Sequence, residues 1–338
     1  MDGPLAESLI TVAEDARSRL RGPESGTARA QLDERYPELL AALEWFAEAG
    51  RQGDAYRLAS ALVPFWISTG RIADGDAWFR RALDRPGGSA VRRTRAIYDH
   101  GYLVFWAGQY DLADKRFAEA RTLASAANDP TVAALALAGS ARVALNTDVD
   151  AAVRLLREAL AVTDGTADRD GRSSAMHVLG VALQMSGDLA GARDVMAARI
   201  ALGRELGDDF IVWVESANLS MVERRLGNLT NAEALSREAL QIVNSHGDEM
   251  AIPWVMNGLA AVLAAKGEHE RAATILATAE TLLERAGGKW PPDERQQLEA
   301  TVAILASALT PEALERARGK GAAMTIEDGV VFALGSER

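Results

Sequence analysis

The sequence predicts an all-α fold, a solenoid of antiparallel helix pairs. Three observations indicate it: a helix-favouring composition, a turn that recurs at a nearly constant step, and small residues at fixed distances from that turn. Hydrophobic residues make up 48% of the 338 residues and charged residues 25%, as in a folded soluble protein. Ala, Leu, Arg and Glu are abundant, and aromatic residues reach only 6%. This composition favours helix because the abundant side chains lose little entropy there.

A turn of the type Gly-[Asp/Asn/Gln/Glu]-[Leu/Tyr/His] recurs along the chain, and its six positions are Gly70, Gly108, Thr147, Gly187, Gly227 and Gly267. Thr147 and Gly70 depart from the pattern but keep the spacing. From one turn to the next the steps are 38, 39, 40, 40 and 40 residues. A step this constant indicates one helix pair repeated along the chain.

Residue size is also periodic around these turns. Five residues after each turn stands a small residue: Gly75, Ala113, Ala152, Ala192, Ala232 and Ala272. Seven residues before it, small residues recur as Gly101, Ser140, Gly180, Ser220 and Ala260. Nine residues after it, a bulky residue recurs as Phe79, Phe117, Leu156, Met196 and Leu276. We expect the small positions to mark close helix crossings and the bulky residue to fill the space between helices.

This arrangement resembles the tetratricopeptide repeat, and the resemblance implies a right-handed superhelical solenoid of antiparallel helix pairs. Residues 32–83 also resemble the start of the helical sensor region of actinobacterial signal-transduction ATPases and LuxR-type, maltose-activator-like regulators. That second resemblance rests on Leu40, Ala41, Ala42, Leu43, Trp45, Trp66, Gly70 and Gly75. The segment 324–334 resembles the helix that closes the same region, with Thr325 as its expected N-cap. The resemblance implies a regulatory sensor or adaptor.

The repeat pattern predicts three parts: an N-terminal helical cap over 1–53, repeats over 54–286 and a C-terminal helical cap over 287–338. Other parts of the resembled regulators are missing. The nearest string to a phosphate-binding loop, AGGKW at 286–290, lacks the first glycine and has no hydroxyl after Lys289. No helix-turn-helix with a basic recognition helix is recognisable. We therefore expect no nucleotide hydrolysis and no cofactor, and we expect a detached sensor region or a free-standing descendant of one.

Charge and cysteine content limit the partners. The net charge of -11 repels phosphate backbones, so we expect no direct nucleic-acid binding. Cysteine is absent, which excludes disulfides and thiolate metal sites and fits a reducing compartment. The acidic N-terminal segment does not resemble a signal peptide, and no apolar run is long enough to span a membrane. We expect a cytoplasmic protein with no membrane contact.

A ligand surface is predicted on the first helix of each pair, which lines the inner, concave face of such solenoids. Positions thirteen, ten, nine, six and two to three before each turn combine aromatic, amide and basic side chains. The candidate ligand-binding residues are Arg95, Tyr98, Tyr102, Trp106, His177, Gln184, Asn218, Met221, Arg225, Trp254 and Asn257. Aromatic walls with a few amides suit an extended peptide, a small molecule or a segment of a protein partner.

Several alternatives remain open from the sequence. The aromatic residues could pack between repeats instead of binding a ligand, because large apolar side chains are mostly buried. The chain could be an enzyme of a biosynthetic pathway with a pocket inside the solenoid, although no residue is assigned as catalytic. Association into a homodimer through the end repeats is a further alternative. The four histidines are isolated in sequence, so no metal site is expected.

Overall fold

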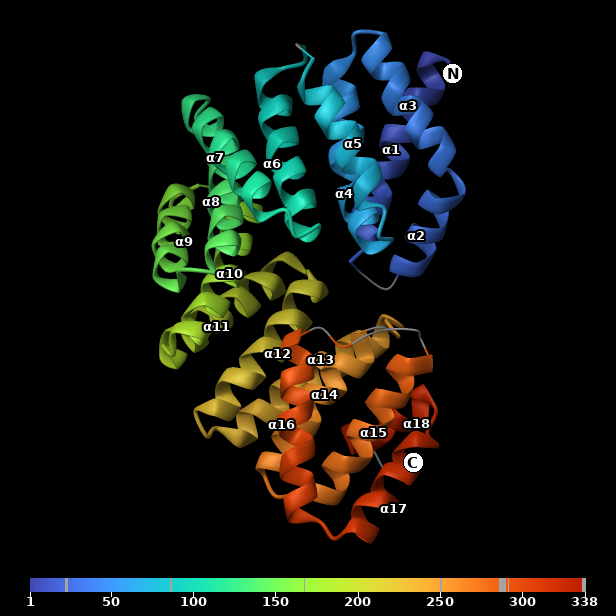
Figure 1. Cartoon of the computed structure of the whole chain (residues 1–338), viewed down its shortest axis with the longest axis vertical. Coiled ribbons are helices and arrows are strands. Elements are labelled where there is room, and N and C mark those ends of the chain that lie inside the picture. Colours follow the sequence, from blue (N-terminus) through green and yellow to red (C-terminus); the bar gives the residue numbers. More distant parts are fainter. Residues whose placement is uncertain are drawn as a thin grey trace. The chain divides into compact units, whose positions relative to one another are not determined.

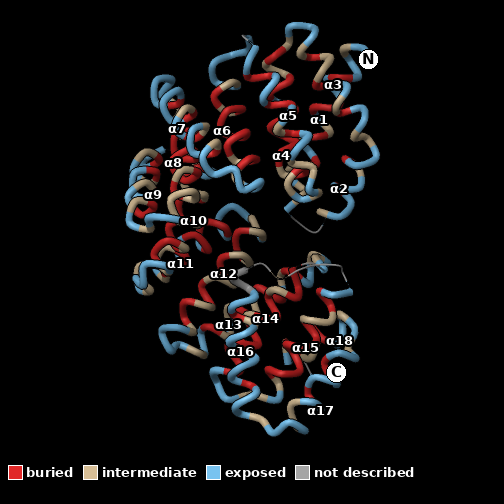
Figure 2. Tube along the Cα trace, in the orientation of Figure 1, coloured by how far each residue is buried: buried red, intermediate tan, exposed pale blue. Residues whose placement is uncertain are grey.

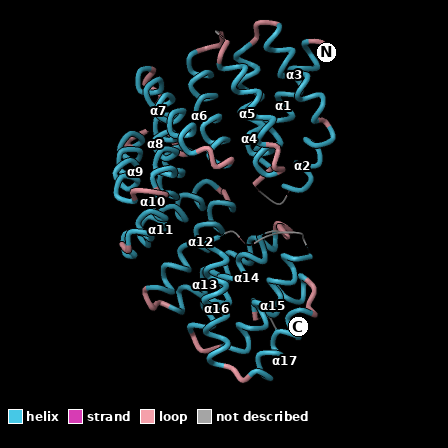
Figure 3. The backbone as a smooth tube through the Cα atoms, viewed as in Figure 1, coloured by secondary structure: helices cyan, strands magenta, loops and turns pink. Residues whose placement is uncertain are grey.

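The computed structural model describes residues 1–338 except 22–23, 86, 167, 250, 286–289, 291 and 336–338, together with the side chains of 292–294. Helices joined by short loops make up the described residues, and no strand occurs among them (Figure 3). The all-α prediction is confirmed. The chain forms two compact units, 1–187 and 188–338. The boundary predicted between 286 and 287, and residues 286–289 of the AGGKW string, lie outside the described residues.

Unit 1 contains ten helices among its described residues (Figure 1). They are α1 (Gly3–Arg19), α2 (Ser25–Glu34), α3 (Tyr36–Glu48), α4 (Gln52–Ser68), α5 (Ile72–Leu83), α6 (Ala90–Trp106), α7 (Tyr110–Ala126), α8 (Pro130–Ala144), α9 (Val149–Thr163) and α10 (Asp170–Ser186).

Unit 2 contains eight helices among its described residues. They are α11 (Leu189–Leu206), α12 (Asp209–Arg225), α13 (Leu229–Ser245), α14 (Ala251–Ala265), α15 (His269–Arg285), α16 (Pro292–Ala308), α17 (Pro311–Ala322) and α18 (Ile326–Leu334). Thr325 caps α18 as predicted, because its hydroxyl accepts a hydrogen bond from the backbone N–H of Asp328 at 3.1 Å.

Each unit stacks its helices as a repeating pair. In unit 1 every helix from α6 to α10 packs on the next, and α6 also lies beside α8, and α8 beside α10. In unit 2 the same order holds from α11 to α15, with α12 beside α14. The buried stretches lie along these contacts (Figure 2). The first helices of the pairs, α6, α8 and α10 in unit 1, therefore form one layer.

The predicted small and bulky positions meet at these contacts. All the bulky residues at the ninth position after the turn are fully buried: Phe79, Phe117, Leu156, Met196 and Leu276. Phe117 of α7 packs against Gly101 of α6 and Gly139 of α8. A Cβ added at Gly101 would lie 3.0 Å from the Phe117 ring, and one at Gly139 would lie 2.6 Å from it. The absence of side chains at the two glycines thus allows one aromatic ring to fill the space between two helices.

Most of the predicted turns share a left-handed glycine. Gly108, Gly187, Gly227 and Gly267 have φ between +74° and +86°, a conformation in which a Cβ is strained. Thr147 departs from this geometry, because α8 ends three residues earlier and Asp148 caps the next helix by accepting a hydrogen bond from Ala151 N–H at 2.8 Å. The spacing between repeats is therefore kept at Thr147, although the local turn geometry differs.

No helix in the described part of the chain is long and apolar enough to cross a lipid bilayer.

We predict that Gly139→Ala destabilises unit 1. The new methyl would lie 2.6 Å from the Phe117 ring, inside van der Waals contact. Overpacking of a core costs about 1–3 kcal/mol, which exceeds the ~1 kcal/mol that alanine gains over glycine in a helix. Thermal unfolding followed by circular dichroism should show a lower midpoint.

Gly319→Ala in α17 is the matched control, because no atom lies within 4 Å of the added Cβ. Its helix should gain about 0.5–1 kcal/mol. Equal effects of the two substitutions would contradict the packing argument.

Candidate functional site

Three aromatic side chains form a ladder along α6. Tyr98, Tyr102 and Trp106 follow one another at four-residue spacing, which places them on one face of the helix. The Tyr98 and Tyr102 rings are stacked, with centroids 6.2 Å apart and an interplanar angle of 18°. Tyr102 meets Trp106 edge to face at 6.2 Å. We call these three residues the α6 ladder.

The α6 ladder runs from the core to solvent. Tyr98 is 7% exposed and its ring also contacts Phe117 at 5.8 Å, whereas Trp106 is 52% exposed. Phe105 contacts Trp106 at 5.9 Å and Tyr110 at 5.5 Å, so the exposed end is a cluster of aromatic rings. Trp106 and Tyr110 are both exposed. Contiguous exposed apolar groups of this kind can mark a contact surface, which makes this end of α6 a candidate site.

Arginines from two helices lie against the ladder. Arg95 pairs with Asp99 at 2.9 Å, and its guanidinium lies 5.5 Å from the centroid of the Tyr98 ring. Arg142 of α8 lies 5.9 Å from the centroid of the Tyr102 ring, within cation–π range. It also donates a hydrogen bond to the Ser174 hydroxyl of α10 at 3.5 Å. Arg142 of α8 therefore contacts side chains of both α6 and α10.

Burial and neighbouring charges shift the pKa values of Arg95, Tyr98 and Arg17. Attraction to Asp99 raises the pKa of Arg95, so the guanidinium stays charged. Burial raises the pKa of Tyr98 to about 12, which keeps its hydroxyl neutral. Burial also lowers the pKa of Arg17 in α1; attraction to Asp99 opposes this shift, and repulsion from Arg95 adds to it. Arg17 is therefore close enough to Asp99 and Arg95 of α6 for their charges to affect its pKa.

The other predicted residues of unit 1 lie on α10. His177 and Gln184 are both half-buried. The four predicted residues on α6, Arg95 and the α6 ladder, contact one another in sequence order. Sequence reasoning placed these four on one helix face and omitted Arg142, Ser174 and Arg17.

The predicted residues of unit 2 lie on α12 and α14. Asn218 and Met221 are half-buried and Arg225 is exposed on α12. On α14, Trp254 is half-buried and Asn257 is fully buried. The indole N–H of Trp254 is buried and finds no acceptor among the described residues. In addition to its repeat neighbours, α14 packs against α16.

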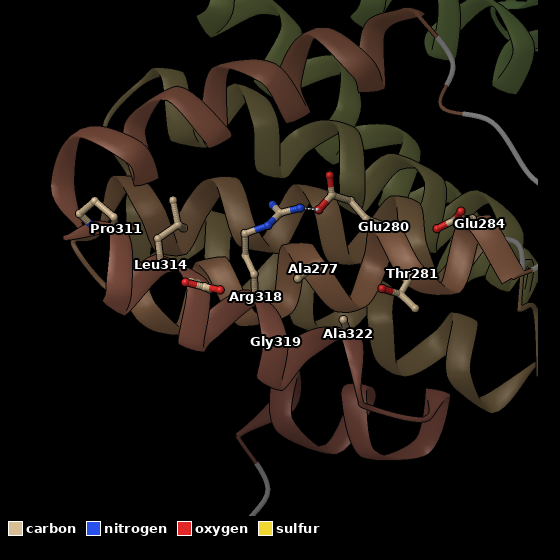
Figure 4. Close-up of a pocket in the computed structure, with 10 residues that line it drawn as sticks. Ala277, Glu280, Thr281, Glu284, Pro311, Leu314, Arg318, Gly319 and Ala322 are labelled. Atoms are coloured by element: carbon tan, nitrogen blue, oxygen red, sulfur yellow. Dashed lines mark ion pairs between the residues drawn. The ribbon is translucent and has the colours of Figure 1, made fainter.

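A cavity of about 690 Å³ opens between α15 and α17 of unit 2 (Figure 4). Leu314 and Ala277 form apolar parts of its wall, and Glu284 adds a carboxylate. The Arg318 side chain points toward Glu280 and pairs with it at 3.0 Å. None of the predicted site residues lines this cavity. The sequence did not indicate this cavity, because the residues that line it lie in the last predicted repeat and in the segment interpreted as a C-terminal cap.

His100 has a lowered pKa, but its side chain is not accessible to solvent. His100 is fully buried, its ring is stacked on Phe79 with centroids 5.5 Å apart, and its Nε2 lies 2.8 Å from Asp76 Oδ1. Burial lowers its pKa, and the hydrogen bond to Asp76 opposes that shift. No group of three metal-ligating side chains occurs among the described residues. His100 is therefore a core residue that does not face a substrate.

The comparisons with known proteins agree with this architecture. A family model described as tetratricopeptide repeat matches residues 210–285, across the α12–α15 pairs. This part of the chain is therefore similar to tetratricopeptide repeats. Residues 210–285 lie in unit 2, and the helix pairs of unit 1 have the same packing order.

Solved structures share the repeat fold over most of the chain. A Rap protein complexed with competence and sporulation factor has a TM-score of 0.53 at 14% identity, over 97% of this chain and 99% of that one. A signal transduction ATPase with a tetratricopeptide repeat sensor from Pyrococcus horikoshii has a TM-score of 0.54 at 11% identity, over 87% of this chain and 49% of that one. At these identities the likeness concerns the fold.

A relative in sequence is a protein of Mycobacterium tuberculosis provisionally named an HTH-type transcriptional regulator. It is 29% identical over 294 residues, which cover 82% of this chain and 32% of the relative. A protein of Mycobacterium bovis with the same description matches equally. The chain spans about a third of the length of these relatives.

We predict that acid weakens unit 1 through His100. Because burial lowers its pKa below the usual ~6.5, the unfolded chain binds a proton more readily than the folded one. The contribution of neutral His100 is present above that usual value and is lost as the pH falls below it. Arg80 and Arg116 repel the protonated ring and act in the same direction, whereas Asp76 opposes them.

Urea unfolding at pH 7.5, 6.5 and 5.5 measures this effect. His100→Gln keeps a side-chain donor for Asp76 and removes the titrating ring, so it should reduce the loss of stability between the first and last pH. An unchanged pH slope in the variant would show that His100 does not cause the effect.

Proposed function

We propose that this chain is a regulatory sensor that binds a peptide or a small molecule on the α6, α8 and α10 layer of unit 1. The α6 ladder carries this proposal. It combines a buried ring, a half-buried ring and an exposed indole in one continuous stack, with Arg142 of the neighbouring helix beside it. Rigid aromatic faces supply contact area at low entropic cost, and the arginine supplies a polar contact.

The exposure of Trp106 argues against a purely structural role for the whole ladder. A ring that only packs between repeats is buried, as Phe117 and Phe79 are. Tyr98 fits that structural role, but Tyr102 is half-buried and Trp106 is 52% exposed. The inner part of the ladder thus supports the fold, and the outer part is available to a ligand.

The relatives support a regulatory role. The Rap protein was solved with competence and sporulation factor, and the Pyrococcus protein carries a tetratricopeptide repeat sensor. The mycobacterial relatives are provisionally named transcriptional regulators, of which this chain covers 32%. We propose that ligand binding here contributes to a cytoplasmic signalling response of that kind, either within a longer regulator or through a protein partner.

The proposal predicts that Tyr102→Ala weakens ligand binding. Peptide and metabolite libraries are first screened by thermal shift on the wild-type chain, and hits are titrated by tryptophan fluorescence. Loss of a central aromatic contact should weaken binding by at least about tenfold. Trp106→Phe should remove part of the fluorescence response, because the indole lies at the exposed end of the ladder.

Leu123→Ala is the control, since Leu123 is an exposed apolar residue of α7 in the same unit. It should leave every affinity unchanged. Circular dichroism should confirm that each variant is folded. The proposal fails if no library member shifts the wild-type protein, or if Tyr102→Ala binds every hit as tightly as the wild type.

A further inference from the structure

The cavity between α15 and α17 of unit 2 is a second place where a small molecule can bind. Its volume of about 690 Å³ lies within the usual range for small-molecule sites. All the residues that line it belong to unit 2. Its repeat helix, α15, is the second helix of a pair, whereas the α6 ladder lies on a first helix in unit 1. The cavity is therefore a site of its own.

The lining of this cavity is acidic. Its ionisable side chains are three carboxylates and one guanidinium, from Glu280, Glu284, Glu315 and Arg318. Arg318 pairs with Glu280 at 3.0 Å. Neither Glu284 nor Glu315 forms an ion pair with a described residue. Three carboxylates against one guanidinium leave two negative charges uncompensated in the lining, so the cavity favours a cationic ligand.

A further arginine near the cavity makes other contacts. Arg285, at the end of α15, donates hydrogen bonds to the carbonyl oxygens of Ala322 at 3.2 Å and Met324 at 3.4 Å. Its donors thus bind the backbone at the end of α17, and it forms no ion pair with a described carboxylate.

One carboxylate oxygen in the wall lacks a hydrogen bond. Oε2 of Glu280 is buried and accepts no hydrogen bond from the described residues, although Arg318 Nη2 lies 3.0 Å from it. The contact is an ion pair without the alignment of a hydrogen bond. A buried carboxylate oxygen without a donor costs free energy, and a ligand that brings an N–H donor removes that cost.

The carboxylates are spread along the cavity. Glu280 and Glu284 lie one turn apart on α15, whereas Glu315 follows Leu314 on α17. Figure 4 shows Glu284 at one end of the cavity and Leu314 and Pro311 toward the other. No group of three acidic or histidine side chains in the described part of the chain is placed to hold a metal ion. This distribution suits an elongated cation with a charge at each end better than a compact ion.

We infer that the cavity binds a linear diammonium ion, a short aliphatic chain with a primary ammonium group at each end. One ammonium lies between Glu280 and Glu284 and donates to the buried Oε2. The other lies at Glu315, and the methylene groups between them lie against Ala277 and Leu314. An ammonium group has three donors, so one group can serve two carboxylates. The inference goes beyond the sensor proposal, since it concerns a different ligand in a different unit.

Calorimetric titration of the full chain at low salt tests this inference. The probes are putrescine, cadaverine and hexamethylenediamine, matched by chain length with butylamine, pentylamine and hexylamine. Each monoamine keeps the aliphatic chain and one charge but cannot bind both ends of the cavity. The best diamine should bind about tenfold more tightly than its monoamine, as expected for one additional charge-assisted hydrogen bond.

Removal of single charges locates the site. Glu315→Gln should lower the affinity for the best diamine about tenfold, to that of its monoamine. Glu284→Gln should lower it by a smaller factor, because Glu280 remains at that end. Glu312→Gln is the matched control, since Glu312 is exposed on α17, does not line the cavity and changes the net charge equally. It should retain the full preference for the diamine, and circular dichroism should confirm that each variant is folded.

Equal binding of diamine and monoamine, no binding of any diamine, or an equal loss in Glu312→Gln and Glu315→Gln overturns the inference. Tyr102→Ala should bind the diamines as the wild type does, because Tyr102 belongs to unit 1. Failure of the diamines therefore leaves the proposed sensor function standing, and failure of the Tyr102 experiment leaves this inference standing.

Discussion

The structure of unit 1 depends on the close approach of helices around Phe117. Its ring fills the space between α6 and α8 because Gly101 and Gly139 offer no side chain there. Close-packed interiors transmit small changes in volume, so this contact fixes the separation of the two helices. That separation is what brings Arg142 of α8 to 5.9 Å from the Tyr102 ring of α6. The candidate site is a consequence of the packing beneath it.

The same ring joins the core to the α6 ladder. Phe117 contacts Tyr98 at 5.8 Å, Tyr98 stacks on Tyr102, and Tyr102 meets Trp106. Contacts therefore continue from an exposed indole to the crossing of two helices. The buried rings of Phe117 and Tyr98 restrict the motion of the ladder residues that would contact a ligand. A surface held in place before binding loses less conformational entropy when the ligand binds. The arginines make the contact directional, because the planar guanidinium donates its hydrogen bonds in a few fixed directions.

Periodicity made most of the fold predictable. The step of 38 to 40 residues fixed the helix pairs, and the left-handed glycines such as Gly187 ended their first helices as expected. The turn at Thr147 was harder to foresee, because Asp148 replaces the glycine geometry with a side-chain cap. The ladder was predictable because its residues share one helix at four-residue spacing. Arg142 and Arg17 were not, since their relation to α6 depends on how separate helices pack, and no spacing encodes that.

Hydrogen exchange with mass spectrometry, on the chain alone and saturated with a library hit, tests the central claim most directly. Our account predicts slower exchange in the stretches of α6, α8 and α10 that contain Tyr102, Arg142 and Ser174, with no change around the cavity between α15 and α17. Protection confined to α15 and α17, or absent from the α6 layer, would contradict the assignment of the ligand surface to unit 1.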